Sequence, residues 1–457
     1  MSKLWKADNG DDSRRKGGSA ESKGGAVGGK DAAGNTTAGS LEKRVEAFTV
    51  GNDIELDQVL LPYDLEASSV HLEQLRKAGL VSDEEAESLQ GGLAEIGELH
   101  GDGRFEILAE HEDGHTAIEV WLTERFGGVG GKIHTGRSRN DQVLTAMRLF
   151  EKDRLGEVLE LAGKFAGRLL DKAEEGRRLP MPGYTHTRKA MLSSGGQWLA
   201  GYAELIILQM EASSGIRELT DRSPLGTAAG FGTTIDLDRD EEADALGFIR
   251  PLISAASAQL SRGWVEMQLV QYLSGITSLL ARLADDIIQY SSEAYGLIDL
   301  DPAVCTGSSI MPNKKNPDLA ELVRGKNALM QGHEATLRGI IQQIGSGYHR
   351  DLQLTKEPVI RAFELTESLL EASSILVDAI QWNEKAMREA CTPEMMAAEE
   401  ANRLVKEQGY SFREAYRKVK GQLQEGTFDI DPDARLEGYT QLGSPGNPGL
   451  DRLRKML

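Results

Sequence analysis

The chain has 457 residues and a formal net charge of -20. This acidic balance argues against a nucleic-acid or anionic-membrane partner, because either would need a basic face on the protein. Two cysteines are too few for a disulfide framework or a zinc-ligand cluster, so we expect a reducing, cytoplasmic location and no metal site. The N-terminus lacks the apolar core of a secretory signal, and no run reaches the ~20 apolar residues of a membrane span.

Residues 10–40 are rich in Gly, Ala, Ser, Asn and Lys and carry no aromatic residue. Such a segment buries too little apolar surface to offset the entropy of ordering it, so we predict a disordered insertion there. We expect three folded domains after it. These are an N-terminal helical domain (41–140), a central bundle of long helices (141–385) and a small C-terminal helical domain (386–457).

The stretch 134–141 reads His-Thr-Gly-Arg-Ser-Arg-Asn-Asp and precedes a predicted helix. A helix N-terminus favours anions, and arginine adds bidentate recognition of carboxylates. Ser138, Arg139 and Asn140 are therefore candidates for binding an anionic substrate. The alternative is a capped helix that carries exposed arginines.

Long proline-free spans separate the few prolines of the chain, which permits long helices. Residues 142–176, 196–220 and 265–288 have apolar positions three and four residues apart. In the last span the apolar positions form a seam like that of a coiled coil: Leu269, Leu273, Ile276, Leu280, Leu283 and Ile287. We predict an all-α protein built on a long central helical bundle, with a short extended segment at 231–237.

Met-Pro-Gly-Tyr-Thr-His (181–186) places a histidine just past a Pro-Gly turn and before a long helix. Histidine is the usual proton-transfer group near neutral pH. A single histidine is more often structural than catalytic, so His186 needs support from other residues.

Residues 307–317 read Gly-Ser-Ser-Ile-Met-Pro-Asn-Lys-Lys-Asn-Pro, which is the most informative stretch of the chain. A permissive turn, hydroxyls, a cation at Lys314 and a helix start suit a mobile loop that closes on an anion. If Asn316 is the N-cap, Glu321 projects from the second turn, where its carboxylate can orient a histidine. An ordinary loop and a dipole-compensating acid are the alternatives.

Tyr348, Gln353 and Lys356 belong to a further polar cluster, which suits a carboxylate-bearing ligand or else forms a solvated face.

These stretches together resemble the argininosuccinate lyase family of the fumarase/aspartase superfamily, over about residues 41–370 and in the family's order. The resemblance implies a homotetramer with a 20-helix core and active sites shared between subunits. It also implies reversible β-elimination of argininosuccinate to arginine and fumarate, the last step of arginine biosynthesis, without a cofactor.

The resemblance also implies a role for each matching residue. Ser308 matches the base that removes the Cβ proton, and His186 with Glu321 matches the pair that protonates the leaving nitrogen. The two proton-transfer roles of serine and histidine have been read both ways in the superfamily. Lys314 matches the lysine that stabilises the doubly charged aci-carboxylate. The matching substrate-binding positions are Ser138, Arg139, Asn140, Thr185, Asn316, Tyr348, Gln353 and Lys356.

The chain departs from the family pattern at residues 259–264, where Gln-Leu-Ser-Arg-Gly-Trp lacks the family's usual acids. The competing interpretations are adenylosuccinate lyase, fumarase, an aspartase-like enzyme, a non-catalytic structural homologue or a plain helical scaffold. Intact Ser308, His186, Lys314 and Glu321 disfavour the structural homologue, and a plain helical scaffold leaves the four polar clusters unexplained.

Overall fold

The computed structural model describes residues 37–311 and 313–457, which form two compact units. One unit contains residues up to Met147 together with Ser223–Ala255, and the other contains Arg148–Arg222 and Ala256–Leu457. Residues 10–36 of the predicted disordered insertion lie outside the part of the chain that the structure describes. The three predicted folded domains stay a prediction.

The first unit is helical and has its own apolar core. Its elements are α1 (Thr37–Val50), α2 (Asp53–Lys77), α3 (Asp83–Gly101), η1 (Ala109–His111), α4 (Gly114–Phe126), η2 (Gly127–His134), the start of α5 (Arg139–Glu175), α8 (Arg239–Ala245) and β4 (Arg250–Pro251). Local signals set the helix starts: Ser82 and Glu85 form a reciprocal capping box on α3. The carboxylate of Asp113 accepts the backbone N–H of Thr116 on α4.

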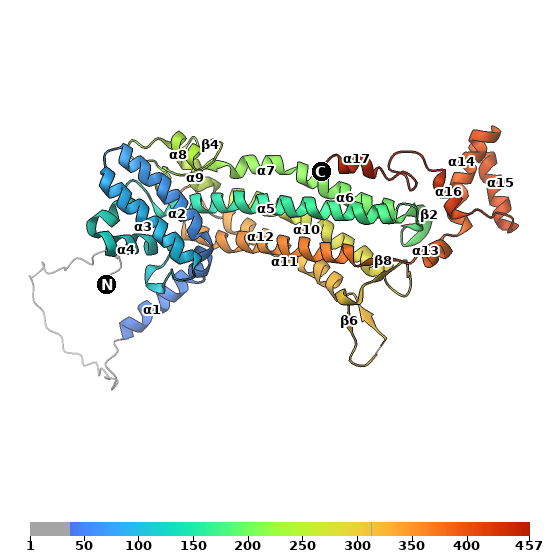
Figure 1. The fold of residues 1–457 in the computed structure, drawn as a ribbon, viewed down its shortest axis with the longest axis horizontal. Coiled ribbons are helices and arrows are strands. Elements are labelled where there is room, and N and C mark those ends of the chain that lie inside the picture. The colour runs from blue at the N-terminus through green and yellow to red at the C-terminus, as the bar shows by residue number, and fades with distance from the viewer. Residues whose placement is uncertain (1–36, 312) are drawn as a thin grey trace, which may run out of the picture. The chain divides into compact units, whose positions relative to one another are not determined.

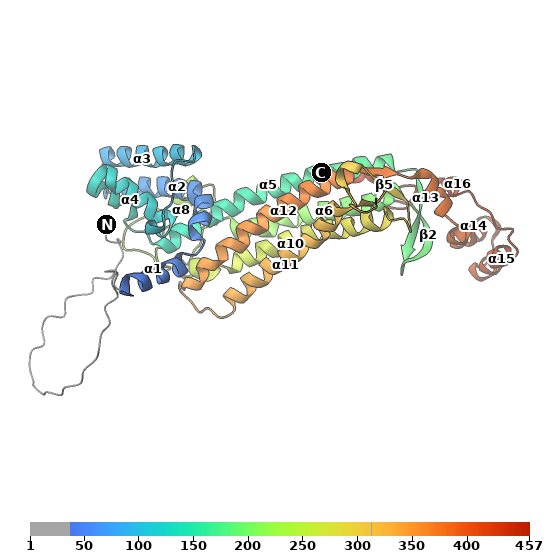
Figure 2. The same cartoon turned by 90° about the horizontal axis from the view of Figure 1, so that it is seen from below.

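The second unit is a bundle of long helices that run side by side in Figures 1 and 2. Its helices are the rest of α5, α6 (Gly195–Glu211), α7 (Ser213–Thr220), α9 (Ala255–Ser261), α10 (Trp264–Tyr290), α11 (Asp318–Ile341) and α12 (Lys356–Asp378). The predicted helices 142–176 and 265–288 are confirmed. The predicted span 196–220 is helical but divides at Ala212 into α6 and α7.

The apolar seam predicted on α10 is buried in the bundle: each of its six side chains is at most 2% exposed. Burial of one such side chain contributes about 1.5–3 kcal/mol. Beside this seam, the fully buried guanidinium of Arg148 on α5 bonds Glu151 at 2.7 Å and Glu266 on α10 at 3.0 Å. Removing one partner of such a buried group costs about 3–5 kcal/mol, so this contact fixes α5 against α10.

Strands are few and short, which confirms the all-α prediction. They are β1 (Pro180–Thr185), β2 (Arg188–Ser194), β3 (Arg222–Ser223), β4, β5 (Ile298–Leu300), β6 (Thr306–Gly307), β7 (Lys315–Asn316) and β8 (Ile380–Trp382). The extended segment predicted at 231–237 forms no strand: Phe231 lies in a turn, Thr234 and Ile235 lie in a bend, and Gly232 has a positive φ of 79. The hairpin of β1 and β2 was not predicted.

Short helices complete the second unit. They are η3 (Pro302–Val304), η4 (Arg350–Thr355), α13 (Glu384–Ala390), η5 (Pro393–Met396), α14 (Ala397–Gln408), α15 (Phe412–Gln424), α16 (Pro432–Glu437) and α17 (Leu450–Arg454). α14 and α15 share a small apolar core around Leu404 and Val419. None of the helices within the described ranges has the length and apolar content to cross a membrane.

Candidate functional site

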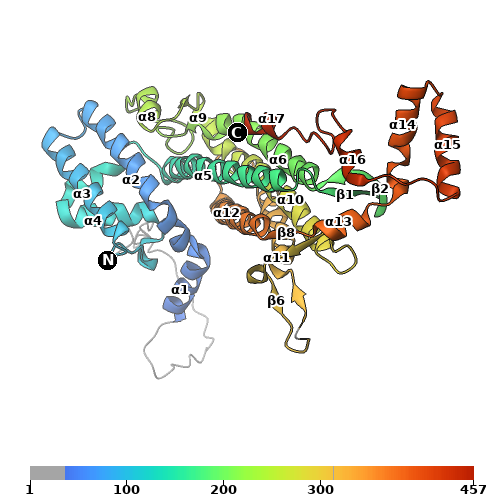
Figure 3. The same ribbon diagram turned by 45° about the vertical axis from the view of Figure 1, so that its right-hand side comes forward.

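The signature stretch forms a small antiparallel hairpin that stands out from the bundle (Figures 1 and 3). Thr306 pairs with Asn316 and Gly307 with Lys315, so the connecting loop carries Ser308 and Lys314. Asn316 as the N-cap of the following helix is wrong, because α11 begins at Asp318 and Pro317 precedes it. A residue before proline avoids the helical region, which keeps Asn316 extended in β7.

Ser308 lies at the first position of this loop, and its side-chain oxygen accepts two hydrogen bonds from the loop backbone. Its Oγ accepts the backbone N–H of Ile310 at 3.2 Å and that of Met311 at 3.1 Å. Two N–H dipoles aimed at one hydroxyl oxygen stabilise negative charge on that oxygen. The loop therefore favours the alkoxide form of Ser308 more than an exposed serine does.

Lys314 and Glu321 lie on the same hairpin and helix start as Ser308, and both are exposed. The backbone N–H of Lys314 donates to the carbonyl of Met311 at 3.1 Å, which closes the loop. Glu321 lies one turn into α11, and its backbone N–H donates to Pro317. One local element thus carries the hydroxyl, the cation and the carboxylate.

His186 lies at the tip of the β1–β2 hairpin, with Thr185 at the end of β1, and both are exposed. The structure places β2 between His186 and α6, which begins at Gly195, and the Pro-Gly pair that was expected to form a turn lies within β1. His186 and Thr187 have φ of 53 and 59, the pair of positive values that a two-residue hairpin turn demands. Non-glycine residues in this region are strained, and such strain is frequent at functional sites.

The third cluster lies at the opposite end of α11. Tyr348 precedes η4, Gln353 lies within η4, and Lys356 begins α12, where it is 3% exposed. The guanidinium carbon of Arg262 lies 5.3 Å from the centroid of the Tyr348 ring, a cation–π contact that holds this ring.

One chain does not bring these clusters together. Ser308 precedes α11 and Tyr348 follows it, and the 24 residues of α11 span about 36 Å at 1.5 Å per residue. No hydrogen bond or ion pair joins the side chains of His186 and Glu321 in the described part of the chain.

Ser138, Arg139 and Asn140 lie at the start of α5 in the first unit, where Asp141 fixes their backbone. One carboxylate oxygen of Asp141 accepts the N–H of Ser138 at 2.9 Å, and the other accepts the N–H of Ala228 at 2.7 Å. Burial raises the pKa of Asp141 to about 6. Ser138 Oγ in turn accepts the N–H of Asn140 at 3.3 Å.

The two arginines of this stretch have different surroundings. Arg139 is half-buried, lies 3.1 Å from the carboxylate of Asp113 and donates to Thr116 at 2.9 Å. The side chain of Arg137 is fully buried and donates to Ser68 at 2.8 Å, with Asp64 at 3.7 Å. Arg137 therefore supports the first unit from within, and it is not among the residues predicted to bind the substrate.

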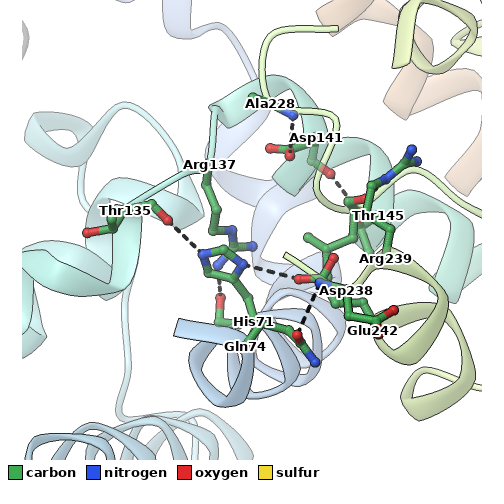
Figure 4. Close-up of polar contacts among 12 residues, drawn as sticks. His71, Gln74, Thr135, Arg137, Asp141, Thr145, Ala228, Asp238, Arg239 and Glu242 are labelled. Atoms are coloured by element: carbon green, nitrogen blue, oxygen red, sulfur yellow. Dashed lines mark hydrogen bonds and ion pairs between the residues drawn. The ribbon is translucent and has the colours of Figure 1, made fainter. Parts of the chain in front are cut away.

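A buried polar network behind this segment escaped the sequence analysis. Figure 4 shows His71 of α2 between Thr135 and Glu242 of α8. His71 Nε2 lies 2.9 Å from the Thr135 carbonyl, which only accepts, so Nε2 carries the proton. Burial lowers the pKa of His71 to about 3, so the ring is neutral and Nδ1 is an acceptor.

Glu242 faces this acceptor, with its Oε1 3.4 Å from Nδ1 of His71. Burial raises the pKa of Glu242 to about 7, so its carboxyl holds a proton below that pH and can then donate to Nδ1. The sequence offers no local signal for this pair, because 171 positions separate the two residues.

Comparisons with known proteins support a lyase. A family model described as lyase matches residues 39–332. The argininosuccinate lyase of Sorangium cellulosum (strain So ce56) is 40% identical over 92% of this chain and 97% of its own length. That of Stenotrophomonas maltophilia (strain K279a) is 38% identical over 91% and 96%.

Solved structures agree on the fold. EDDS lyase in complex with formate superposes with a TM-score of 0.75 at 22% identity, covering 90% of this chain and 89% of that chain. The class II fumarase from Schistosoma mansoni gives 0.70 at 19% identity, covering 86% and 91%. With a family model over most of its length and relatives at this level of identity, the chain belongs to the argininosuccinate lyase family.

Proposed function

We propose that this protein cleaves argininosuccinate reversibly to arginine and fumarate by β-elimination, without a cofactor, as the last step of arginine biosynthesis. The two relatives compared above are named argininosuccinate lyase, and the match to this chain covers 97% and 96% of their length. The observation that carries the chemistry is the Ser308 oxygen, which accepts two backbone N–H groups beside Lys314. This arrangement suits a serine that must act as a base.

Elimination begins with loss of a proton from the carbon next to a carboxylate, which places a second negative charge on that carboxylate. In the proposed division of labour, Ser308 takes the Cβ proton and the ammonium of Lys314 stabilises the aci-carboxylate. Preorganised charge of this kind is usually the largest catalytic term. His186, oriented by Glu321, protonates the departing guanidino nitrogen.

The remaining proposed residues bind the substrate. Arg139 supplies a guanidinium that binds a carboxylate of the substrate. The others supply hydroxyl, amide and ammonium groups: Ser138, Asn140, Thr185, Asn316, Tyr348, Gln353 and Lys356.

We propose that copies of the chain assemble into a homotetramer whose sites combine clusters from different subunits. The length of α11 between Ser308 and Tyr348 supports this, since one chain holds the two clusters apart. α11 also exposes Leu322 (58%) and Leu329 (57%), and only four of its 24 residues are buried within the chain. A second copy of the helix is the natural cover for such a face.

Glycines on α11 add to this argument. Gly325, Gly332 and Gly339 recur at seven-residue spacing, and a Cβ built on any of them meets nothing within 4 Å. Open space beside regularly spaced glycines permits the close approach of another helix. We also propose a cytoplasmic location, supported by the free thiols of Cys305 and Cys391.

Fumarate release tests the proposal directly. The purified protein is incubated with argininosuccinate, adenylosuccinate, malate or aspartate, and fumarate is followed by its ultraviolet absorbance. We expect release from argininosuccinate alone, with arginine appearing in equal amount. Release from one of the other three substrates instead would replace the proposed function.

A further inference from the structure

The hairpin of β1 and β2 contains one extra residue near its tip. Gly183 pairs with Met191, whereas the next residue along β1, Tyr184, pairs with Lys189, so Ala190 is one residue more than the register requires. An extra residue of this kind is a β-bulge, which bends its strand and redirects the side chains beyond it. The bulge therefore lies between the body of the hairpin and its tip.

The bulge determines how the chain turns at His186. Beyond it Thr185 pairs with Arg188, which leaves His186 and Thr187 as a two-residue turn with φ of 53 and 59. Without the extra residue the same strands would leave only Thr187 to connect them, and two residues are the usual short hairpin connection. The backbone conformation of His186 thus depends on the residues that pair directly beyond the bulge.

Tyr184 is the member of that pair whose side chain packs into the second unit. Its ring centroid lies 5.1 Å from that of Tyr295, edge to face, and 6.3 Å from that of Tyr290 at the end of α10. The three rings belong to one apolar cluster. Aromatic pairs at such distances are favourable and have preferred orientations, so Tyr184 connects the hairpin tip to the end of α10.

The aromatic cluster is itself fixed by a carboxylate. Asp286 of α10 accepts hydrogen bonds from Nε1 of Trp198 at 2.9 Å and from the hydroxyl of Tyr202 at 2.7 Å, both on α6. The Trp198 ring packs edge to face against Tyr290, with 5.0 Å between the centroids. On the opposite strand, Nζ of Lys189 donates to the carbonyl of the last residue of α13 at 2.6 Å. Both residues of the pair beyond the bulge are therefore attached to helices.

We propose that Tyr184 is a positioning residue, whose ring holds the turn so that His186 can protonate the leaving nitrogen. This inference rests on the proposed function for the role of His186. Positive φ is unfavourable for histidine and threonine, and such a turn persists only when its surroundings hold it. Once the ring is removed, the tip loses its contact with α10 and the turn relaxes.

Replacement of Tyr184 tests this role by turnover of argininosuccinate. Tyr184→Ala should lower kcat about 100-fold, because a displacement of about 1 Å at a catalytic group can cost that much. Tyr184→Phe keeps the ring and should stay within about threefold of the wild type. Tyr416→Ala is the matched control, since Tyr416 is a tyrosine of α15 that is 55% exposed and lies outside the cluster, and it should leave kcat unchanged.

A double-mutant cycle separates positioning from a purely structural role. In the His186→Gln background, Tyr184→Ala should change the residual kcat by less than about twofold, because the group that it positions is already absent. Loss of folded or assembled protein would instead lower kcat by the same factor in both backgrounds, and that result would overturn the proposal. A Tyr184→Phe variant as slow as Tyr184→Ala would also overturn it, since the hydroxyl and not the ring would then be required.

NMR of protein labelled with ¹³C,¹⁵N-histidine tests the position of the turn without any turnover. The His186 signal is assigned by its loss in His186→Gln, and its ¹³Cα shift reports the positive φ. This shift should change in Tyr184→Ala and persist in Tyr184→Phe, while the signals of the other histidines stay in place as the control. If the wild type releases no fumarate from argininosuccinate, the proposed function fails and this measurement still decides whether Tyr184 holds the turn. An unchanged His186 shift in Tyr184→Ala would overturn the proposal.

Discussion

The hydroxyl oxygen of Ser308 accepts a hydrogen bond from the backbone N–H of Met311, with 3.1 Å between the two atoms. The neighbouring N–H of Ile310 donates to the same oxygen at 3.2 Å. Both donors belong to the loop itself, and Ile310 is 87% exposed. The charge-stabilising geometry around Ser308 therefore exists in a single chain, before any substrate or second copy is present.

Ser308→Ala should lower kcat by at least about 100-fold, because positioned proton transfer contributes about 10²–10⁴-fold. Binding of argininosuccinate should persist, since other residues hold the substrate. Stopped-flow fumarate release and calorimetry measure the two effects. Ser309→Ala is the matched control, because Ser309 is an exposed serine on the same loop, and it should keep most of the activity. Near-normal turnover of Ser308→Ala would remove Ser308 from the mechanism.

If active sites are shared between subunits, mixed oligomers of two inactive variants should regain activity. Ser308→Ala and His186→Gln are mixed in equal amounts, dissociated and reassembled. A site that takes one group from each of two different chains is intact in about a quarter of random combinations. Recovery of about a quarter of the wild-type activity is expected, and each variant reassembled alone is the control. Absence of any recovery would mean that one chain supplies both groups.

Leu329→Asp should dissociate the oligomer and abolish activity, because it places a charge on the apolar face of α11 that we assign to subunit contacts. Multi-angle light scattering gives the mass, and fumarate release gives the activity. Leu442→Asp is the control, since Leu442 is similarly exposed at 51% but lies outside the bundle helices. An active monomer of Leu329→Asp would contradict both the interface and the shared site.

Glu242→Gln should steepen the pH dependence of stability. Glu242 binds its proton more tightly in the folded chain, so its contribution to the free energy of unfolding falls as the pH rises from 4.5 to about 7. His71 resists protonation when folded, so its contribution rises with pH from about 3 to 6.5. The two trends oppose each other in the wild type between pH 4.5 and 6.5.

The glutamine amide replaces the carboxyl as donor to His71 but does not titrate, so only the histidine trend remains. The unfolding free energy of Glu242→Gln should therefore rise between pH 4.5 and 6.5 by up to about 1.4 kcal/mol per pH unit more than that of the wild type. Urea unfolding across this range measures it. Asp240→Asn, an exposed change on the same helix, should leave the slope unaltered. Parallel slopes for wild type and Glu242→Gln would refute the buried protonated carboxyl.

Helix periodicity and motif chemistry determined much of this protein without a structure. The seam from Leu269 to Ile287 predicts a buried helix, and that helix is α10, because a repeat of three and four residues aligns apolar side chains whatever surrounds them. The polar stretches at 134–141, 181–186 and 307–317 identified the family for the same reason: their residue types and order are local properties of the chain.

Tertiary structure alone decided where those stretches lie and what surrounds them. The His186 turn depends on the pairing of β1 with β2. The raised pKa of Glu242 and the lowered pKa of His71 both need burial that no local pattern reveals. α11 packs against α10 and α12, and this tertiary packing stabilises the long helix that holds Ser308 and Tyr348 apart. Residue types thus specified which chemical groups the site uses, and packing determined how far apart one chain holds these groups.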